Sequence, residues 1–333
     1  MLRRMPDSAS KTMARWRRDR ANRRIFASAL LGLAVGAGAS FAATEAEELI
    51  LCGGKEVFVL DLKADGKKVW SWLAAEHSEI PATVRKQFGT TDDCKPVQEG
   101  SKLLITSSGG GVALVERASG RALFWASVED AHSAELLPRD RVVVAGADGN
   151  RLALFDLSQP EKEIASHPLE GAHGLVWDPE LRYLWALGYK ELQAYELKDW
   201  GTATPAFALS RRFDLPDRGG HDLRPLPGTR RLALTTDQHV WTFDPESRRF
   251  EPFDGLGDLQ AVKSVDIDPR TGRIAYVQAE TSWWSSRVFL LGAEGEVQRR
   301  GERLYKARWN CTIQGIRGDE ALRRVGGSTR SQE

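Results

Sequence analysis

The chain has 333 residues, 41% of them hydrophobic and 28% charged, a composition typical of a water-soluble globular protein and not of a disordered or membrane protein. Its net charge of +1 hides an uneven distribution: residues 1–42 carry nine Lys or Arg and two acids, which leaves 38 basic and 44 acidic side chains, a charge of −6, on the remainder. This acidic body argues against nucleic-acid binding, which needs a basic surface. Three cysteines, Cys52, Cys94 and Cys311, are too few and too scattered for a disulfide framework or a CxxC metal site.

Residues 1–42 have the pattern of an export signal. A basic leader ends in Arg23 and Arg24, an apolar stretch rich in glycine and alanine follows over residues 27–39, and small residues allow cleavage after Ala42. The apolar stretch is shorter than the roughly 20 residues that span a bilayer, so we expect no permanent membrane span. The arginine pair, followed by Phe26, resembles a twin-arginine signal, and an ordinary Sec signal is the alternative. Either signal predicts a periplasmic or secreted bacterial protein.

A short alternating apolar segment closed by an acidic residue recurs along the rest of the chain. The five clear copies are residues 57–61, 112–116, 152–156, 192–196 and 240–244, and a degenerate copy without the acid lies at 288–291. The acids are separated by 55, 40, 40 and 48 residues. Periods of this length built from short strands are typical of β-propeller blades, and the two-residue alternation excludes helical solenoids.

The repeats predict an all-β, six-bladed β-propeller with four-stranded blades. Five blades are complete, and the sixth is closed by both chain ends, from the segments 305–311, 49–52, 57–60 and 68–73. Such closure removes exposed sheet edges. We expect one propeller domain over residues 43–314, a short helix over residues 80–88, a disordered tail over residues 315–333, and a monomer. Cys52 and Cys311 fall near opposite ends of strands in the closing blade, which leaves a disulfide between them open.

The first strand of a blade lines the central channel, and its first residues lie near one mouth of that channel. Alignment of the repeats gives six equivalent segments, residues 93–95, 131–133, 172–174, 220–222, 262–264 and 306–308. His132, His173 and His221 share one phase in three consecutive blades. Three imidazoles that converge on the channel would suit a divalent metal, with Zn, Mn, Fe or Cu as candidates.

Charged residues of the same segments complete the candidate site. Lys95, Lys263, Lys306 and Arg308 would supply positive charge for a carboxylate, sulfate or phosphate. Glu135, Asp222 and Lys263 are the candidates for proton transfer. The alternative is structural, because WD-type propellers carry a hydrogen-bonding Gly-His at this position, which residues 220–221 resemble.

Trp283 and Trp284 form the second signal. They lie in a segment, residues 281–286, that we expect to join the second and third strands of the last complete blade, on the same face as the histidines. Packing between blades is the ordinary role of such tryptophans. The alternative is that one indole stacks on a sugar or another flat ligand.

The chain resembles an uncharacterised family of exported bacterial propeller proteins, a domain of unknown function in the WD40/YVTN-like superfamily. The resemblance rests on residues 107–115, 131–138, 173–178, 219–223, 263–264, 283–284 and 306–309. It implies the six-bladed fold over nearly the whole mature chain and no particular activity, because fold alone does not specify function.

Three functions follow as hypotheses. The first is a binding protein that captures a small anionic or carbohydrate ligand at the channel mouth, with or without a metal. The second is a metal-dependent lyase or hydrolase acting on uronate-type glycans, in which the metal neutralises a carboxylate. The third is a protein-interaction scaffold, which needs neither phased histidines nor basic residues at the mouth. Substitution of His132 and His173 separates the third from the others, since a scaffold should tolerate it.

Overall fold

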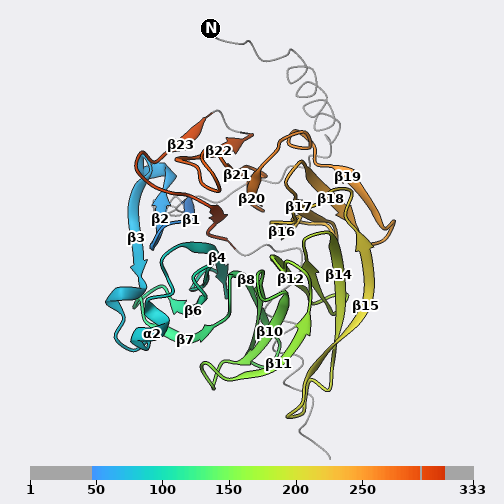
Figure 1. Cartoon of the computed structure of the whole chain (residues 1–333). Coiled ribbons are helices and arrows are strands. Elements are labelled where there is room, and N and C mark those ends of the chain that lie inside the picture. The colour runs from blue at the N-terminus through green and yellow to red at the C-terminus, as the bar shows by residue number, and fades with distance from the viewer. Residues whose placement is uncertain (1–46, 293–294, 312–333) are drawn as a thin grey trace, which may run out of the picture. The chain divides into compact units, whose positions relative to one another are not determined.

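The computed structural model of the chain describes residues 47–292 and 295–311. These residues form six four-stranded antiparallel sheets, arranged as the blades of a ring (Figure 1). The predicted all-β, six-bladed propeller is therefore confirmed. The predicted signal at 1–42 and tail at 315–333 lie outside the described residues. Within the described part, no helix is long and apolar enough to cross a membrane.

The strands of each blade run from the centre of the ring outwards. Blade 1 consists of β24 (Lys306–Trp309), β1 (Glu48–Cys52), β2 (Glu56–Asp61) and β3 (Lys67–Leu73). Blade 2 consists of β4 (Thr91–Val97), β5 (Lys102–Ser107), β6 (Gly111–Glu116) and β7 (Ala122–Ser127). Blade 3 consists of β8 (Ala131–Leu137), β9 (Arg141–Gly146), β10 (Arg151–Asp156) and β11 (Glu163–Pro168).

The other three blades follow the same order. Blade 4 consists of β12 (Gly174–Asp178), β13 (Tyr183–Leu187), β14 (Glu191–Lys198) and β15 (Ala206–Asp214). Blade 5 consists of β16 (Asp222–Pro225), β17 (Leu232–Thr235), β18 (Val240–Asp244) and β19 (Arg249–Pro252). Blade 6 consists of β20 (Val262–Ile267), β21 (Ile274–Gln278), β22 (Arg287–Leu291) and β23 (Glu296–Gln298). The innermost strands of neighbouring blades contact one another around the ring.

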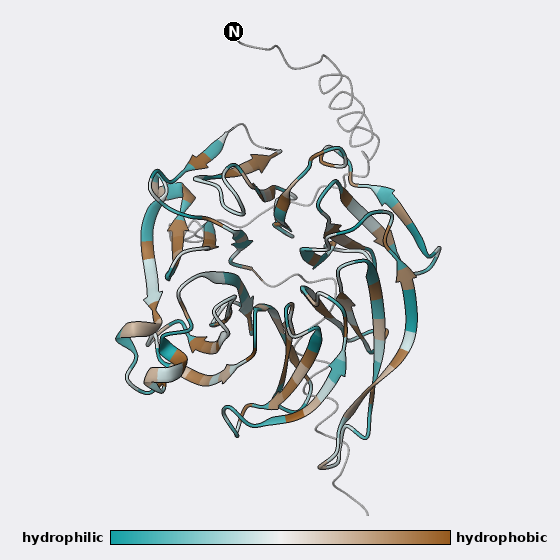
Figure 2. Cartoon of the chain, in the orientation of Figure 1, coloured by the Kyte–Doolittle hydropathy of each residue, from teal (hydrophilic) through white to brown (hydrophobic). Residues whose placement is uncertain are grey.

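Burial follows the position of a strand within its blade. Every residue of β9 is buried, whereas the outer strand β15 alternates between covered and exposed residues. Because blades stack face to face, their inner strands are covered on both faces and need continuous apolar sequence. Hydrophobic segments accordingly run along the strands of each blade (Figure 2). Trp185 of blade 4 shows the packing, since its ring lies 5.7 Å from Phe243 of blade 5.

The insertion between blades 1 and 2 is mostly irregular. It contains the α-helix α2 (Ala82–Arg85), and two 3-10 turns, η1 (Leu62–Ala64) and η2 (Ala74–Glu76), follow β2 and β3. The predicted helix over residues 80–88 is therefore shorter than expected. Ile80, Val84 and Phe88 are nevertheless buried against blades 1 and 2, so burial of this apolar face holds the insertion in place.

Both chain ends meet in the closing blade, as predicted. Leu49 lies opposite Trp309, and Cys52 lies opposite Lys306. Cys311 follows the other end of β24, and its sulfur lies 3.9 Å from Asp268 Oδ1. Cys52 and Cys311 thus lie near opposite ends of the paired strands, and both are free thiols.

The turn between β1 and β2 allows a test of how closely the segment before β24 packs against the first strands of blade 1. Gly53 has φ +153°, and a Cβ built there would lie 2.0 Å from the backbone oxygen of Arg303, whereas a Cβ on Gly54 would meet nothing within 4 Å. We expect Gly53→Ala to lower the free energy of unfolding by about 2–3 kcal/mol, because the backbone of the segment before β24 must move. Denaturant unfolding checks this. A loss of similar size in Gly54→Ala would contradict the steric explanation.

Candidate functional site at the channel mouth

The inner strands begin at one mouth of the channel, and each carries a polar residue at or just before its start. In blades 2, 3 and 6 this residue is the extra one of a β-bulge. In blades 4 and 5 it precedes the strand, and its N–H donates to a carbonyl of the second strand. We call these residues the mouth ring, in order from blade 2 to blade 1: Asp92, His132, His173, His221, Lys263 and Lys306.

The structure brings the three histidines of the mouth ring together. The ring centres of His132 and His173 are 4.1 Å apart, and those of His173 and His221 are 5.4 Å apart. Tyr305, which comes directly before β24, lies edge-on to His132 at 6.1 Å. The common phase of the histidines in the sequence therefore corresponds to a contiguous cluster of rings in space.

Backbone carbonyls fix the protonation of two of these rings. His132 Nδ1 lies 3.0 Å from the carbonyl oxygen of Asp130, and His173 Nδ1 lies 2.9 Å from that of Gly171. A carbonyl only accepts, so each Nδ1 must donate, and each neutral ring then has its lone pair on Nε2. Burial, reinforced by the neighbouring His132 and His221, holds the pKa of His173 well below its usual value. His173 is therefore neutral at physiological pH.

Lys263 is a buried cation that contacts two aromatic side chains. Its Nζ lies 2.8 Å from Nε2 of His221 and 5.0 Å from the centre of the Trp283 ring. The residue is 2% exposed. Burial lowers the pKa of Lys263 to about 8, an effect that Asp237 opposes and Lys306 reinforces. Burial also lowers the pKa of His221 to about 4. At neutral pH the amine is largely charged and faces a neutral imidazole.

The partners of His221 compete for one nitrogen. Asp237 Oδ1 lies 2.9 Å from the same Nε2 that Lys263 approaches. Nε2 of His221 either carries a proton, which it donates to Asp237, or has a lone pair, which accepts from Lys263. It can therefore form a hydrogen bond to only one of the two. Nδ1 of His221 is buried and has no hydrogen-bond partner among the described residues. The mouth thus has unused hydrogen-bonding capacity on both His221 and Lys263.

The two adjacent tryptophans have different surroundings. Their loop joins β21 and β22, as predicted, and Trp283 is 57% exposed. Trp284 is half-buried, and the guanidinium of Arg303 lies 5.2 Å from its ring centre. Of the two indoles, Trp283 is therefore the one that adjoins the mouth ring and has free surface for a flat ligand.

A buried ionic network, which includes Lys306 of the mouth ring, crosses the channel. Arg308 of blade 1 donates to Asp222 of blade 5 through both terminal nitrogens, at 2.8 and 2.6 Å, and to Asp93 of blade 2 through Nε at 2.9 Å. Lys306 Nζ lies 3.3 Å from Asp222 and 3.7 Å from Asp93. Burial alone would raise the pKa of both carboxyl groups, but Arg308 and Lys306 lower it overall. Two cations and two carboxylates thus neutralise one another.

Further ion pairs involve the remaining charged candidates on the inner strands. Lys95 Nζ lies 3.2 Å from Glu135 and donates to the carbonyl of Leu175 at 2.6 Å. Arg224 Nε donates to Asp266 at 2.8 Å. The structure thus places Lys95, Glu135, Asp222, Lys306 and Arg308 in ion pairs inside the ring, and brings His132, His173, His221, Lys263 and Trp283 together at the mouth.

Several polar residues of the mouth do not follow from the repeat alignment. Asp92 lies one residue before the aligned segment 93–95, and its Oδ1 is 3.7 Å from His132 Nε2. Burial raises the pKa of Asp92. Its 40-residue spacing from His132 matches the blade period and is the signal that could have found it. Asp237 lies in the turn between β17 and β18, which has no repeating pattern.

The described residues do not form a complete set of metal ligands. Among residues 47–292 and 295–311, no three His, Cys, Asp or Glu side chains are placed to hold one metal ion. The metal at His132, His173 and His221 stays a prediction. The contacts of His132 Nδ1 and His173 Nδ1 with backbone carbonyls are the feature that suits it, because metal-binding histidines commonly donate one N–H to a carbonyl.

The sequence was compared with known proteins. No curated protein matches the chain. Residues 45–314, which include every strand of the ring, match a described family. The chain belongs to the family of unknown function DUF6528.

Proposed function

We propose that this chain is an exported binding protein that captures a small anionic ligand, such as an acidic sugar, at the mouth ring. One observation carries the proposal. Of the buried cations on the innermost strands, Lys95, Arg224, Lys306 and Arg308 each have a carboxylate within 4 Å, whereas Lys263 has none among the described residues. A buried charge without a direct ion-pair partner is costly, and a bound anion would supply that partner in addition to the more distant Asp237.

The surroundings of Lys263 suit an anion attached to a flat apolar body. His221 Nδ1 and the Nε2 atoms of His132 and His173 offer hydrogen-bonding groups to hydroxyls. The exposed face of Trp283 offers a stacking surface next to the charge, as sugar-binding sites require. Together, these groups favour a carboxylate-bearing sugar over a bare inorganic anion.

Export is part of the proposal and rests on the sequence of residues 1–42. The basic leader, the short apolar stretch and the cleavage site support a periplasmic or secreted location. Membership of the WD40/YVTN-like superfamily is likewise proposed, on the six four-stranded blades and the Gly-His at residues 220–221.

A metal-dependent lyase or hydrolase is the second candidate. The Nε2 lone pair of the neutral His173 favours it, since this nitrogen has no partner among the described residues. Among the predicted proton-transfer residues, Lys263 suits the role of base best, because its pKa of about 8 leaves part of the amine neutral at physiological pH. Asp222 is held in its charged form by Arg308 and Lys306.

Calorimetric titration at pH 7 tests the proposed function. We expect galacturonate to bind at least about tenfold more tightly than galactose, because a hydrogen bond to a charged group contributes about 1.5–3 kcal/mol. Sulfate and phosphate should compete with galacturonate. Equal affinity for galactose, or no binding of any of these anions, would contradict the proposal. The titration is repeated after dialysis against a chelator, with metal analysis alongside. Binding lost together with a stoichiometric metal would favour the second candidate.

A further inference from the structure

A separate cavity of about 530 Å³ lies between blades 3 and 4. Its lining comes from the β8–β9 turn, the β12–β13 turn and the end of β14 with the loop that follows. These turns come after the inner strands end, whereas the mouth ring lies where those strands begin. β8 has seven residues, which span about 20 Å at roughly 3.3 Å per residue. The cavity is therefore on the opposite face of the ring from the mouth.

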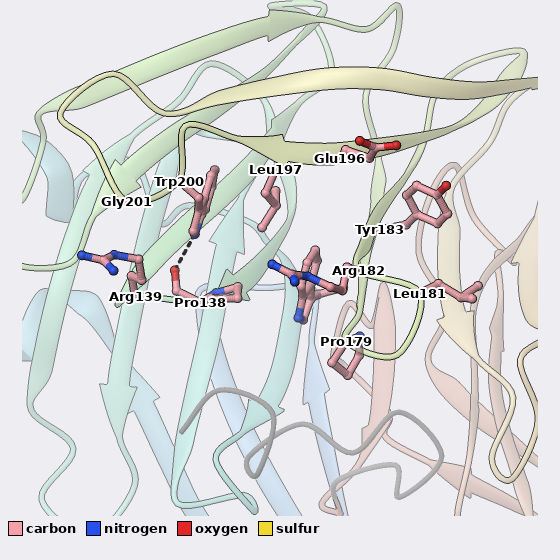
Figure 3. A pocket seen from close by; sticks show the side chains of 11 residues that line it. Pro138, Arg139, Pro179, Leu181, Arg182, Tyr183, Glu196, Leu197, Trp200 and Gly201 are labelled. Carbon is pink, nitrogen blue, oxygen red and sulfur yellow. Dashed lines mark hydrogen bonds between the residues drawn. The ribbon is translucent and has the colours of Figure 1, made fainter. Parts of the chain in front are cut away.

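One wall of the cavity is held rigidly. Trp200 Nε1 donates to the carbonyl of Pro138 at 2.9 Å, which ties the β14–β15 loop to blade 3. The guanidinium of Arg141 lies 4.6 Å from the Trp200 ring centre and donates to the Trp200 carbonyl at 2.8 Å. Figure 3 shows Trp200, Leu197 and Glu196 along one side of the cavity and Pro138 and Arg182 along the other. The aromatic wall is thus in place before any ligand arrives.

The rim of the cavity has an excess of positive charge. Arg139 and Arg182 are exposed, and neither has a carboxylate within 4 Å among the described residues. The one carboxylate in the lining, Glu196, lies 2.5 Å from Lys198 Nζ and accepts from Ser210 at 3.3 Å. Two guanidinium groups are therefore free to bind an anion, whereas the carboxylate is already neutralised.

The aromatic lining also has an unused donor. Trp177 belongs to the lining, and its Nε1 is buried without a hydrogen-bond partner in the described part of the chain. Tyr183 supplies a third aromatic ring beside Trp177 and Trp200. Cavities of roughly 300–1,000 Å³ with aromatic walls and a few polar groups are typical of small-molecule sites.

We infer that this cavity binds a planar organic anion, an aromatic carboxylate, with its ring between the aromatic side chains and its carboxylate on Arg182, while Arg139 adds positive charge at the rim. Guanidinium groups bind carboxylates through paired hydrogen bonds, which favours this class of anion. The volume accommodates one or two fused rings. This site is independent of the mouth ring and does not require the function proposed there.

Fluorine NMR of the protein labelled with 5-fluorotryptophan tests the inference, with 2-naphthoate as the probe. The resonances of Trp177 and Trp200, assigned with Trp177→Phe and Trp200→Phe, should shift on titration, and that of Trp283 should not. The neutral analogue 2-naphthalenemethanol should bind at least about tenfold more weakly. The double variant Arg139→Ala/Arg182→Ala should lose a similar factor, whereas Arg249→Ala, an exposed control in β19, should bind like the wild type.

Four outcomes would overturn the inference. The first is that the Trp177 and Trp200 resonances do not shift, and the second is that the neutral analogue binds as tightly as 2-naphthoate. The third is that the double variant binds 2-naphthoate like the wild type. The fourth is that Lys263→Met loses binding, which would place the probe at the mouth ring. A response to galacturonate and not to naphthoate would also overturn it. The tryptophan resonances themselves show whether each variant is folded, so a negative result is not confused with misfolding.

Discussion

Replacement of Arg308 by methionine is expected to lower the free energy of unfolding by about 3–5 kcal/mol, because it leaves two buried carboxylates without their main partner. Arg308 is fully buried and makes three hydrogen bonds, to Asp93 and Asp222, across the channel. The methionine fills most of the arginine's volume. The lower free energy of unfolding therefore reflects the loss of the charge and not the creation of a cavity. Denaturant unfolding at pH 7 measures it.

A surface pair provides the matched control. Lys198 and Glu196 also form an ion pair, but both side chains are well exposed. Lys198→Met should therefore change the unfolding free energy far less than Arg308→Met does. An equally small change in Arg308→Met would contradict the view that the buried network stabilises the closed ring.

The pH dependence of the Arg308 effect has a definite sign. The pKa values of Asp93 and Asp222 are lowered in the folded protein, so their contribution to stability is present above the unfolded value and is lost as pH falls towards the folded values. The gap between wild type and Arg308→Met should therefore narrow below about pH 4, where carboxylates of the unfolded chain become protonated. A gap that widened in acid would contradict the assignment.

Replacement of Lys263 by methionine is expected to weaken binding of an acidic sugar about 10- to 100-fold, the equivalent of one hydrogen bond to a charged group. The same change should leave the unfolding free energy unchanged or raise it, because it removes a buried cation that lacks a carboxylate partner. Weaker binding without loss of stability would show that Lys263 acts in ligand binding and not in stabilising the fold.

Two comparisons make the Lys263 result interpretable. Lys162→Met, an exposed control in blade 3, should bind like the wild type. Binding of galactose should be weak in both Lys263→Met and the wild type. A Lys263→Met protein that binds galacturonate as well as the wild type would remove Lys263 from the site.

The repeat pattern predicted the blades well because each blade has the same requirement for burial. The strands expected at residues 49–52 and 57–60 lie within β1 and β2. The closing blade also followed from the sequence, since one strand near the C-terminal end and three near the N-terminal end were left over from the five complete blades. The helix over residues 80–88 was overestimated, because packing of Ile80, Val84 and Phe88 does not require helical backbone at all three positions.

The contacts within the candidate site were harder to predict from the sequence than the blades, because they depend on the geometry of the closed ring. The position of a residue within its repeat predicts its height along the channel. On this basis His132, His173 and His221 could be grouped from the sequence. The repeat position does not show which charges meet across the ring. Asp222 and Arg308 are 86 residues apart and come from blades that are not neighbours. Their pairing depends on the width of the channel, which appears only when the ring is closed.

Proton uptake on binding tests the central claim, that Lys263 at the mouth ring takes the anion, most directly. The measurement is calorimetry of galacturonate binding at pH 8 in two buffers with different heats of ionisation. With its pKa at about 8, the amine of Lys263 is half-charged at this pH, and an anion beside it raises that pKa. We predict uptake of roughly half a proton per ligand bound. Absence of uptake in the wild type, or the same uptake in Lys263→Met, would contradict the account.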